Sequence, residues 1–182
     1  MIMGGRIFVI SDTHFGHGNI IKFTNDKGEV IRRHPDGRLF KNVHEHDELI
    51  IKLWNEIITP EDHIYHLGDF AVSKQVVRHT GYRLQGHKRL VRGNHDIAET
   101  KEYLDAGFKE IYGVRVFHKQ GIICSHIPIH PRSLKEGWVN VHGHLHSNVV
   151  RLDSGHPDPR YKCVSVEHTD YKPLYLMESK DA

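Results

Sequence analysis

Clusters of Asp, Asn and His follow five short apolar runs in this chain, and this pattern constrains the fold more than any other feature. Short runs of β-branched and aromatic residues that end at a polar cluster are typical of buried strands. The five clusters are Asp12-Thr13-His14, Gly68-Asp69, Gly93-Asn94-His95-Asp96, Ser125-His126 and His142-Gly143-His144-Leu145-His146. Because a parallel sheet brings the carboxyl ends of its strands to one edge, the clusters predict one polar site at that edge.

The order of the apolar patterns predicts an α/β protein. In the first half of the chain we expect strands over residues 6–11, 63–67 and 87–92, and helices over residues 42–58, 73–85 and 100–106. The second half shows strand patterns alone, over residues 114–118, 122–125, 139–142 and 162–166. Helix 42–58 is the best marked, because Leu49, Leu53 and Trp54 share one face at helical spacing. These patterns indicate sheets flanked by helices, with the site at the strand ends.

Length and charge exclude several classes of protein. The chain has 182 residues, which fits a single domain over residues 1–182. Its 25 Lys and Arg against 23 Asp and Glu give a net charge of +2, which favours neither a nucleic-acid coat nor a polybasic membrane anchor. Cys124 and Cys163 lie in apolar runs without CxxC spacing, so we expect reduced thiols and a cytoplasmic protein. No apolar stretch approaches the length of a membrane span, and no signal-peptide pattern precedes the first strand.

Histidine is the unusual component, with 18 in the chain. It is the commonest metal ligand and the usual acid–base group near neutral pH. Carboxylates beside imidazoles suit Mn, Fe or Zn ions. The absence of thiolates from this set argues against a zinc site with a purely structural role. The candidate ligands are Asp12, His14, Asp69, Asn94, His126, His144 and His146. Seven ligands are too many for one ion, whereas two ions about 3.5–4 Å apart with one bridging carboxylate would use them all, and such sites hydrolyse phosphate esters.

His95 and Asp96 directly follow the candidate ligand Asn94. His95 would lie over the site without sharing the direction of Asn94, so we predict that it is the general acid for the leaving oxygen. Two roles are possible for the Asp96 side chain. It either holds the second ring nitrogen of His95 or caps the helix that follows it.

The motifs DTH, GDF, GNHD, SH and HGHLH, in this order over residues 6–147, resemble those of the calcineurin-like metallophosphoesterase superfamily. The segments SDTHFGHGNII, HLGDF and RGNHD resemble in particular the small single-domain phosphoesterases of bacteria and phages. Five ordered blocks are a specific signal, whereas any one alone would be weak. The resemblance implies a four-layer αββα sandwich with the metal site at the C-terminal ends of the strands.

The resemblance also implies a role for each candidate residue. It assigns Asp12, His14, Asp69 and His146 to the first metal, and Asp69, Asn94, His126 and His144 to the second, with Asp69 as the bridge. His95 takes the role of proton donor, and a hydroxide that bridges the metals is the implied nucleophile. We expect two divalent ions, with manganese first and iron, zinc, nickel or cobalt as alternatives.

These features predict a metal-dependent phosphoesterase that hydrolyses phosphodiester bonds of nucleotides, such as cyclic nucleotides or short nucleic-acid ends. The preference for diesters depends on His95, because a poor alkoxide leaving group benefits from a positioned acid. Two alternatives remain open: a phosphomonoesterase of the same superfamily, and a non-catalytic binding module stabilised by metal. The balanced charge gives little support to binding of extended nucleic acid.

Residues 24–40 form the one irregular region of the chain. Turn signals at residues 26–28 and 35–37 predict a surface hairpin or lid. Its arginines Arg32, Arg33 and Arg38 are expected on a solvated face, with contact to substrate phosphate as the alternative. Histidines outside the clusters are expected to be ordinary hydrogen-bonded or surface residues, except that His17 and His130 could reach a bound phosphate.

Overall fold

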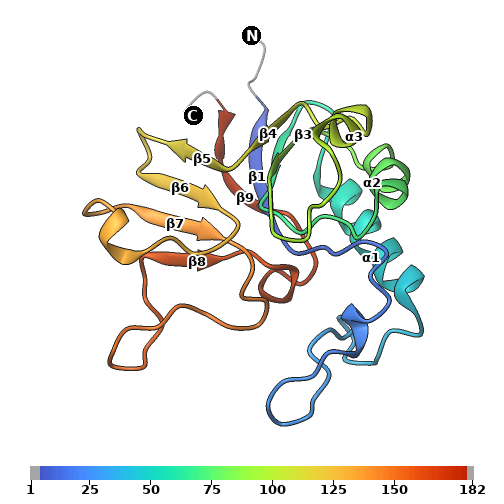
Figure 1. Cartoon of the computed structure of the whole chain (residues 1–182), viewed down its shortest axis with the longest axis horizontal. Helices are drawn as coiled ribbons and strands as arrows, with labels where there is room; N and C mark the ends of the chain where they lie inside the picture. The colour runs from blue at the N-terminus through green and yellow to red at the C-terminus, as the bar shows by residue number, and fades with distance from the viewer. Residues whose placement is uncertain (1–4, 180–182) are drawn as a thin grey trace.

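Two β-sheets packed against each other form the centre of the computed structural model, which describes residues 5–179 (Figure 1). The first sheet has the order β4-β3-β2-β1-β9. Its strands are β1 (Arg6–Ile10), β2 (His63–His66), β3 (His87–Val91), β4 (Glu110–Tyr112) and β9 (Leu174–Glu178). Strands β1 to β4 are parallel and β9 is antiparallel to β1. The carboxyl ends of β1, β2 and β3 therefore lie along one edge.

The second sheet has the order β5-β6-β7-β8 and comes from the C-terminal half of the chain (Figure 1). Its strands are β5 (Val114–Phe117), β6 (Ile122–Ser125), β7 (Val139–His142) and β8 (Tyr161–Cys163). Strands β5 and β6 form an antiparallel hairpin, while β6, β7 and β8 are parallel. This sheet thus also carries polar clusters at the carboxyl ends of two neighbouring strands, β6 and β7.

Three α-helices pack with the first sheet around a shared apolar core (Figure 1). They are α1 (Val43–Ile57), α2 (Lys74–Gly81) and α3 (Thr100–Asp105). Three short 3-10 helices occur in the connections: η1 (Ile20–Lys22), η2 (Pro131–Ser133) and η3 (Val166–His168). The side chain of Asn42 accepts from the Glu45 N–H and caps α1. No helix in the described residues is long and apolar enough to cross a membrane.

The alternation of side chains along β1 creates two separate apolar cores. Phe8 and Ile10 pack into the core shared with the helices. Ile7 and Val9 point to the opposite face and pack into the core between the two sheets. Because neighbouring residues of a strand face opposite sides, one continuous apolar run supports both layers.

The predicted α/β sandwich is confirmed, with differences in detail. Between residues 107 and 179 the structure contains 3-10 turns but no α-helix, so the crossovers beside the second sheet are irregular. Helix α2 ends at Gly81, where a Cβ would lie 2.7 Å from Ala106, rather than at residue 85. Strands β4 and β9 had no counterpart in the sequence patterns; both are short edge strands.

The strand expected over residues 162–166 ends early, and the reason matters for the site. Strand β8 ends at Cys163, and the chain then crosses to the end of β1. The Ser11 N–H donates to the Val164 carbonyl, and the Val166 N–H donates to the Ser11 carbonyl. This crossing joins the two sheets beside the polar clusters. Neither cysteine forms a disulfide, as expected.

Trp54 of α1 provides a test of the helical core. Its side chain is fully buried and its Nε1–H donates to the Gln85 carbonyl. We expect Trp54→Ala to lower the free energy of unfolding by about 3–5 kcal/mol, because it leaves a large cavity. Urea denaturation measures this change, with Tyr82→Ala as the control because Tyr82 is 71% exposed. Similar losses in the two variants would contradict this description of the core.

Candidate metal centre

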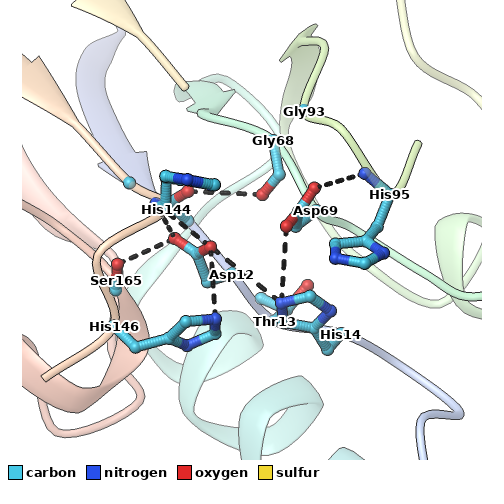
Figure 2. A network of polar contacts seen from close by, with 12 residues as sticks. Asp12, Thr13, His14, Gly68, Asp69, Gly93, His95, His144, His146 and Ser165 are labelled. Atoms are coloured by element: carbon cyan, nitrogen blue, oxygen red, sulfur yellow. Dashed lines mark hydrogen bonds and ion pairs between the residues drawn. The ribbon is translucent and has the colours of Figure 1, made fainter. Parts of the chain in front are cut away.

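The seven candidate ligands lie at the carboxyl ends of strands from both sheets. Figure 2 shows five of them: Asp12, His14, Asp69, His144 and His146. Asp12 and His14 follow β1, Asp69 follows β2 and Asn94 follows β3. From the second sheet, His126 follows β6, and His144 and His146 follow β7. The structure thus brings together clusters that are up to 134 residues apart in the chain, between residues 12 and 146.

The ligand atoms form two groups. One consists of Asp12, His14 and His146, and the other of Asp69, His126 and His144; within each group the ligand atoms lie within 4.8 Å of one another. Asn94 extends the second group, because its Oδ1 lies 2.9 Å from Nε2 of His126. Each group therefore has the mixture of oxygen and nitrogen donors that divalent transition metals bind.

Asp69 belongs to the second group and also lies next to the first. Its Oδ2 is 3.5 Å from Nε2 of His14 in the first group and 3.4 Å from Nε2 of His126 in the second. Its Oδ1 accepts from the backbone N–H of His95 at 2.8 Å, which fixes the carboxylate plane. Burial would raise the pKa of Asp69, but the hydrogen bond and charge of His126 outweigh burial and lower it. Asp69 is thus an ionised carboxylate in contact with a histidine of each group.

Hydrogen bonds orient two of the imidazoles toward the centre. Nδ1 of His126 lies 2.8 Å from the Leu67 carbonyl, and Nδ1 of His146 lies 2.9 Å from Oε1 of Glu167. Since a carbonyl or a carboxylate can only accept, both Nδ1 atoms must donate. With a metal bound, each ring would be neutral and would direct the lone pair of Nε2 toward the ion.

The surroundings of His14 show whether the first ligand group fits a metal ion. Its Nε2 is buried and has no hydrogen-bond partner among the described residues. Burial, followed by the charge of Arg32, lowers the pKa of His14 to about 2. The imidazole is therefore neutral, and a buried unpaired nitrogen is costly unless it meets a cation or a donor. A metal ion among Asp12, His14 and His146 would satisfy it.

Backbone strain is concentrated at the same residues. Seven non-glycine residues in the described part of the chain have positive φ angles: Asp12, His14, Asp69, His144, His146, Asp170 and Tyr171. Five of these seven are candidate ligands. Left-handed backbone is disfavoured for residues other than glycine and persists where the surrounding structure enforces it. The strain therefore marks this edge of the sheets as a functional site.

Two glycines allow the backbones to approach the carboxylates. A Cβ on Gly93 would meet Oδ1 of Asp69, and a Cβ on Gly143 would meet Oδ2 of Asp12 and the Ser11 hydroxyl. Any larger residue would push these carboxylates out of place. The glycines in the GNHD and HGHLH motifs are thus needed for packing against the ligands and not only for turns.

Arg32 does not lie on a solvated face, so that expectation is wrong. Its side chain is 1% exposed, and its guanidinium donates to the carbonyls of Asp12 and Thr13 and to Oε1 of Glu167. Burial would raise the pKa of Glu167, but Arg32 and His146 outweigh burial and lower it. Arg32 therefore stabilises the carboxylate that orients the ligand His146.

Sequence reasoning missed Glu167 as a functional residue. It lies in η3, outside all five clusters, and its importance follows from contact with Arg32 and His146. A buried arginine and carboxylate 135 positions apart leave no local pattern in a sequence. A single sequence therefore held no signal that would have identified this pair.

Asp96 meets neither of its two expected roles. Helix α3 begins at Thr100 with Glu99 as its N-cap. The carboxylate of Asp96 accepts the backbone N–H groups of Asp69, Phe70 and Gly93 and the hydroxyl of Tyr103. Within the described residues it makes no hydrogen bond to the ring of His95. Asp96 fixes the backbone of Asp69, so it is a positioning residue rather than a partner of His95.

His95 lies beside Asp69 and His14 (Figure 2). The residue is exposed, and its ring centroid is 5.5 Å from that of His14. The half-buried His17 is a further neighbour, 5.8 Å from His14 by ring centroids. His130 is exposed at the start of η2 and belongs to neither ligand group. Of these three histidines, it is His95 whose backbone N–H donates a hydrogen bond to Oδ1 of Asp69.

The contact between Glu167 and His146 provides a test of the first ligand group. We expect Glu167→Gln to weaken metal binding about 10–100-fold, because a neutral amide supports the basicity of the imidazole less than a carboxylate does. Calorimetric titration with Mn²⁺ measures the change, and circular dichroism checks the fold. Glu136→Gln is the matched control, since Glu136 is exposed. Unchanged affinity in the Glu167 variant would show that this contact does not support a metal.

Comparison with known proteins gives relatives of similar length. The chain is 35% identical to an uncharacterized protein of Methanocaldococcus jannaschii over 179 residues, covering 94% of this chain and 87% of the relative. It is 27% identical over 183 residues to the gene 66 protein of Mycobacterium phage D29, with 84% of each chain covered. A solved structure of a protein of unknown function from Aquifex aeolicus is similar, with a TM-score of 0.62, 28% identity, and 94% and 95% of the two chains covered.

The family model for calcineurin-like phosphoesterases matches residues 5–175. This range includes both sheets up to the start of β9, all five clusters and the residues Arg32 and Glu167. The match agrees with the resemblance of the motifs and with the two groups of ligand atoms at the strand ends. The chain belongs to the calcineurin-like phosphoesterase family.

Proposed function

We propose that this protein is a dinuclear metal-dependent phosphodiesterase that acts on nucleotides. The observation that carries the proposal is the position of Asp69, whose Oδ2 lies within 3.5 Å of a histidine nitrogen from each ligand group. A carboxylate shared between two groups of ligands is the arrangement needed to hold two ions close together. Membership of a phosphoesterase family supports the hydrolysis of phosphate esters in general.

The chain offers each ion a complete set of ligands. The first would be held by Asp12, His14, Asp69 and His146, and the second by Asp69, Asn94, His126 and His144. Two divalent ions at these positions would supply an activated water and neutralise charge on the phosphoryl oxygens. We propose manganese for both, with iron, zinc, nickel or cobalt as alternatives, because mixed carboxylate and imidazole ligands suit each of these ions.

His95 is the proposed proton donor to the leaving oxygen. Its backbone N–H donates a hydrogen bond to Oδ1 of Asp69, so the residue is held beside the centre even though its side chain is exposed. The position gives access both to a phosphoryl group at the metals and to solvent, from which the ring can be reprotonated. Donation of a proton in the transition state is worth most when the leaving group is a poor one, such as an alkoxide.

Two hollows beside the ligands favour a diester over a monoester. One, of about 260 Å³, is lined in part by His144 and His146, and the other, of about 510 Å³, in part by Asn94 and His126. A phosphodiester carries two organic groups, and each hollow could take one of them. A monoester has only one such group, so the monoesterase alternative would leave one hollow unused.

We propose a small nucleotide ester as substrate rather than extended nucleic acid, since the net charge is +2. We propose a cytoplasmic setting, because both cysteines are free thiols. A binding module without turnover would be expected to lack a metal ligand or the proton donor. This chain contains all seven candidate ligands and the proposed donor His95.

Replacement of the bridging carboxylate tests the proposed centre. We expect metal-stripped protein to regain hydrolysis of bis-p-nitrophenyl phosphate when Mn²⁺ is added, and Asp69→Asn to lose both metal binding and turnover. The neutral amide cannot hold two cations, and this explains the expected loss. Asp153→Asn, at an exposed position, is the matched control. Faster turnover of p-nitrophenyl phosphate would establish the monoesterase instead, and absence of turnover with two bound metals would favour the binding module.

Leaving groups of different quality test the role of His95. We expect His95→Ala to retain metal binding, because only the backbone of His95 contacts Asp69. Its kcat should fall about 10²–10⁴-fold on a dinucleotide, whose alkoxide leaving group needs a proton. The loss should be much smaller on bis-p-nitrophenyl phosphate, because p-nitrophenolate leaves without one. Equal losses on the two substrates, or loss of metal, would refute this role; His44→Ala, with an exposed side chain, is the control.

A further inference from the structure

The smaller of the two hollows has a wall that comes from outside the five polar clusters of the sequence. It is lined by Ile20, Phe23, Ile31, Arg32, His144, Leu145, His146, Ser147, Asn148 and Glu167. Four of these residues belong to the segment 20–32, which includes η1 and the first part of the irregular region. On the other side lie two candidate metal ligands, His144 and His146. A group bound in the hollow would therefore be adjacent to a phosphate at the centre.

The wall of this hollow is apolar and carries one exposed aromatic ring. Ile20, Ile31 and Leu145 line it, together with Phe23, which is 49% exposed. An antiparallel bridge between Thr24 and Val30 holds the two sides of this wall together. An exposed phenyl ring beside a phosphate site is the kind of surface on which nucleic-acid bases stack.

Glu167 lines the hollow, and one of its carboxylate oxygens is buried without a donor. Oε1 of Glu167 accepts from Arg32 and His146, whereas Oε2 is buried and has no hydrogen-bond partner among the described residues. The Glu167 side chain is only 5% exposed. A carboxylate beside the hollow would repel a second phosphate. The preferred occupant is thus a neutral group, and the exposed ring of Phe23 favours a planar one.

We propose that this hollow binds the base of a nucleotide whose phosphate lies at the metal centre, with Phe23 as the stacking surface. The proposal deepens the proposed function and rests on it for the position of the phosphate. The volume of about 260 Å³ is below the range of about 300–1,000 Å³ typical of pockets for drug-sized ligands, so it suits a single ring system. The larger hollow has no Phe, Tyr or Trp among its lining residues, and therefore offers no such surface.

Two diesters with the same leaving group test the proposal. They are the p-nitrophenyl ester of thymidine 5′-phosphate and methyl p-nitrophenyl phosphate, which differ only in the group that stays on the phosphate. We expect a lower KM for the thymidine ester in the wild-type protein, and a KM about tenfold higher for this ester in Phe23→Ala, because base stacking is lost. Leu39→Ala is the matched control, since Leu39 is 51% exposed in the same irregular region and does not line the hollow.

A binding measurement separates this proposal from the proposed function. In zinc-loaded, diamagnetic protein, saturation-transfer NMR should show transfer to the base protons of thymidine 5′-monophosphate, and Phe23→Ala should remove it. Diester turnover without preference for the thymidine ester would overturn the base site and leave the proposed function standing. Transfer to the base that depends on Phe23, without diester turnover, would support the site and overturn the function. Transfer to the sugar protons alone would overturn the base site.

Discussion

The ionised carboxylate of Asp69 is the constraint on which the site depends. It lies between two groups of imidazole and carboxylate ligands, one centred on β1 and β7 and the other on β2, β6 and β7. Two hydrogen bonds hold it there: the Asp69 N–H donates to Oδ2 of Asp96, and the His95 N–H donates to Oδ1 of Asp69. Burial of this charge would be costly without cationic or hydrogen-bonding neighbours. The surrounding histidines and N–H groups provide them, and a pair of cations would do so more completely.

A second buried charge supports the first ligand group from behind. Arg32 comes from the irregular region, yet it is enclosed against the carbonyls of Asp12 and Thr13 and the carboxylate of Glu167. Glu167 in turn orients His146. The irregular region therefore contributes to the site in two ways: Arg32 donates to the backbone of the candidate ligand Asp12 and to Glu167, and Ile31 lines the adjacent hollow beside Phe23. Removal of the region would disturb both together.

Much of the fold and of the candidate site could be predicted from the sequence, and the failures have physical causes. Strand β1 and helix α1 were predicted because their apolar periodicity and caps are local. Strand β9 was missed because it is an edge strand, stabilised by its pairing with β1 rather than by its own pattern. Asp96 was assigned to the wrong partners because its acceptors point to the backbone of Asp69 and Phe70, some 26 residues away.

The sequence by itself determined which residue types stand at the strand ends, and so which chemistry the chain can support, because strand periodicity and polar clusters are local properties. The tertiary structure decided how these clusters divide into two groups and that Asp69 lies between them. It also decided that Arg32 is buried against Glu167 rather than exposed. Such outcomes depend on the approach of segments that are 55 residues apart for Asp69 and His14 and 135 apart for Arg32 and Glu167. The burial of a charge is fixed only when its neighbours in space are known.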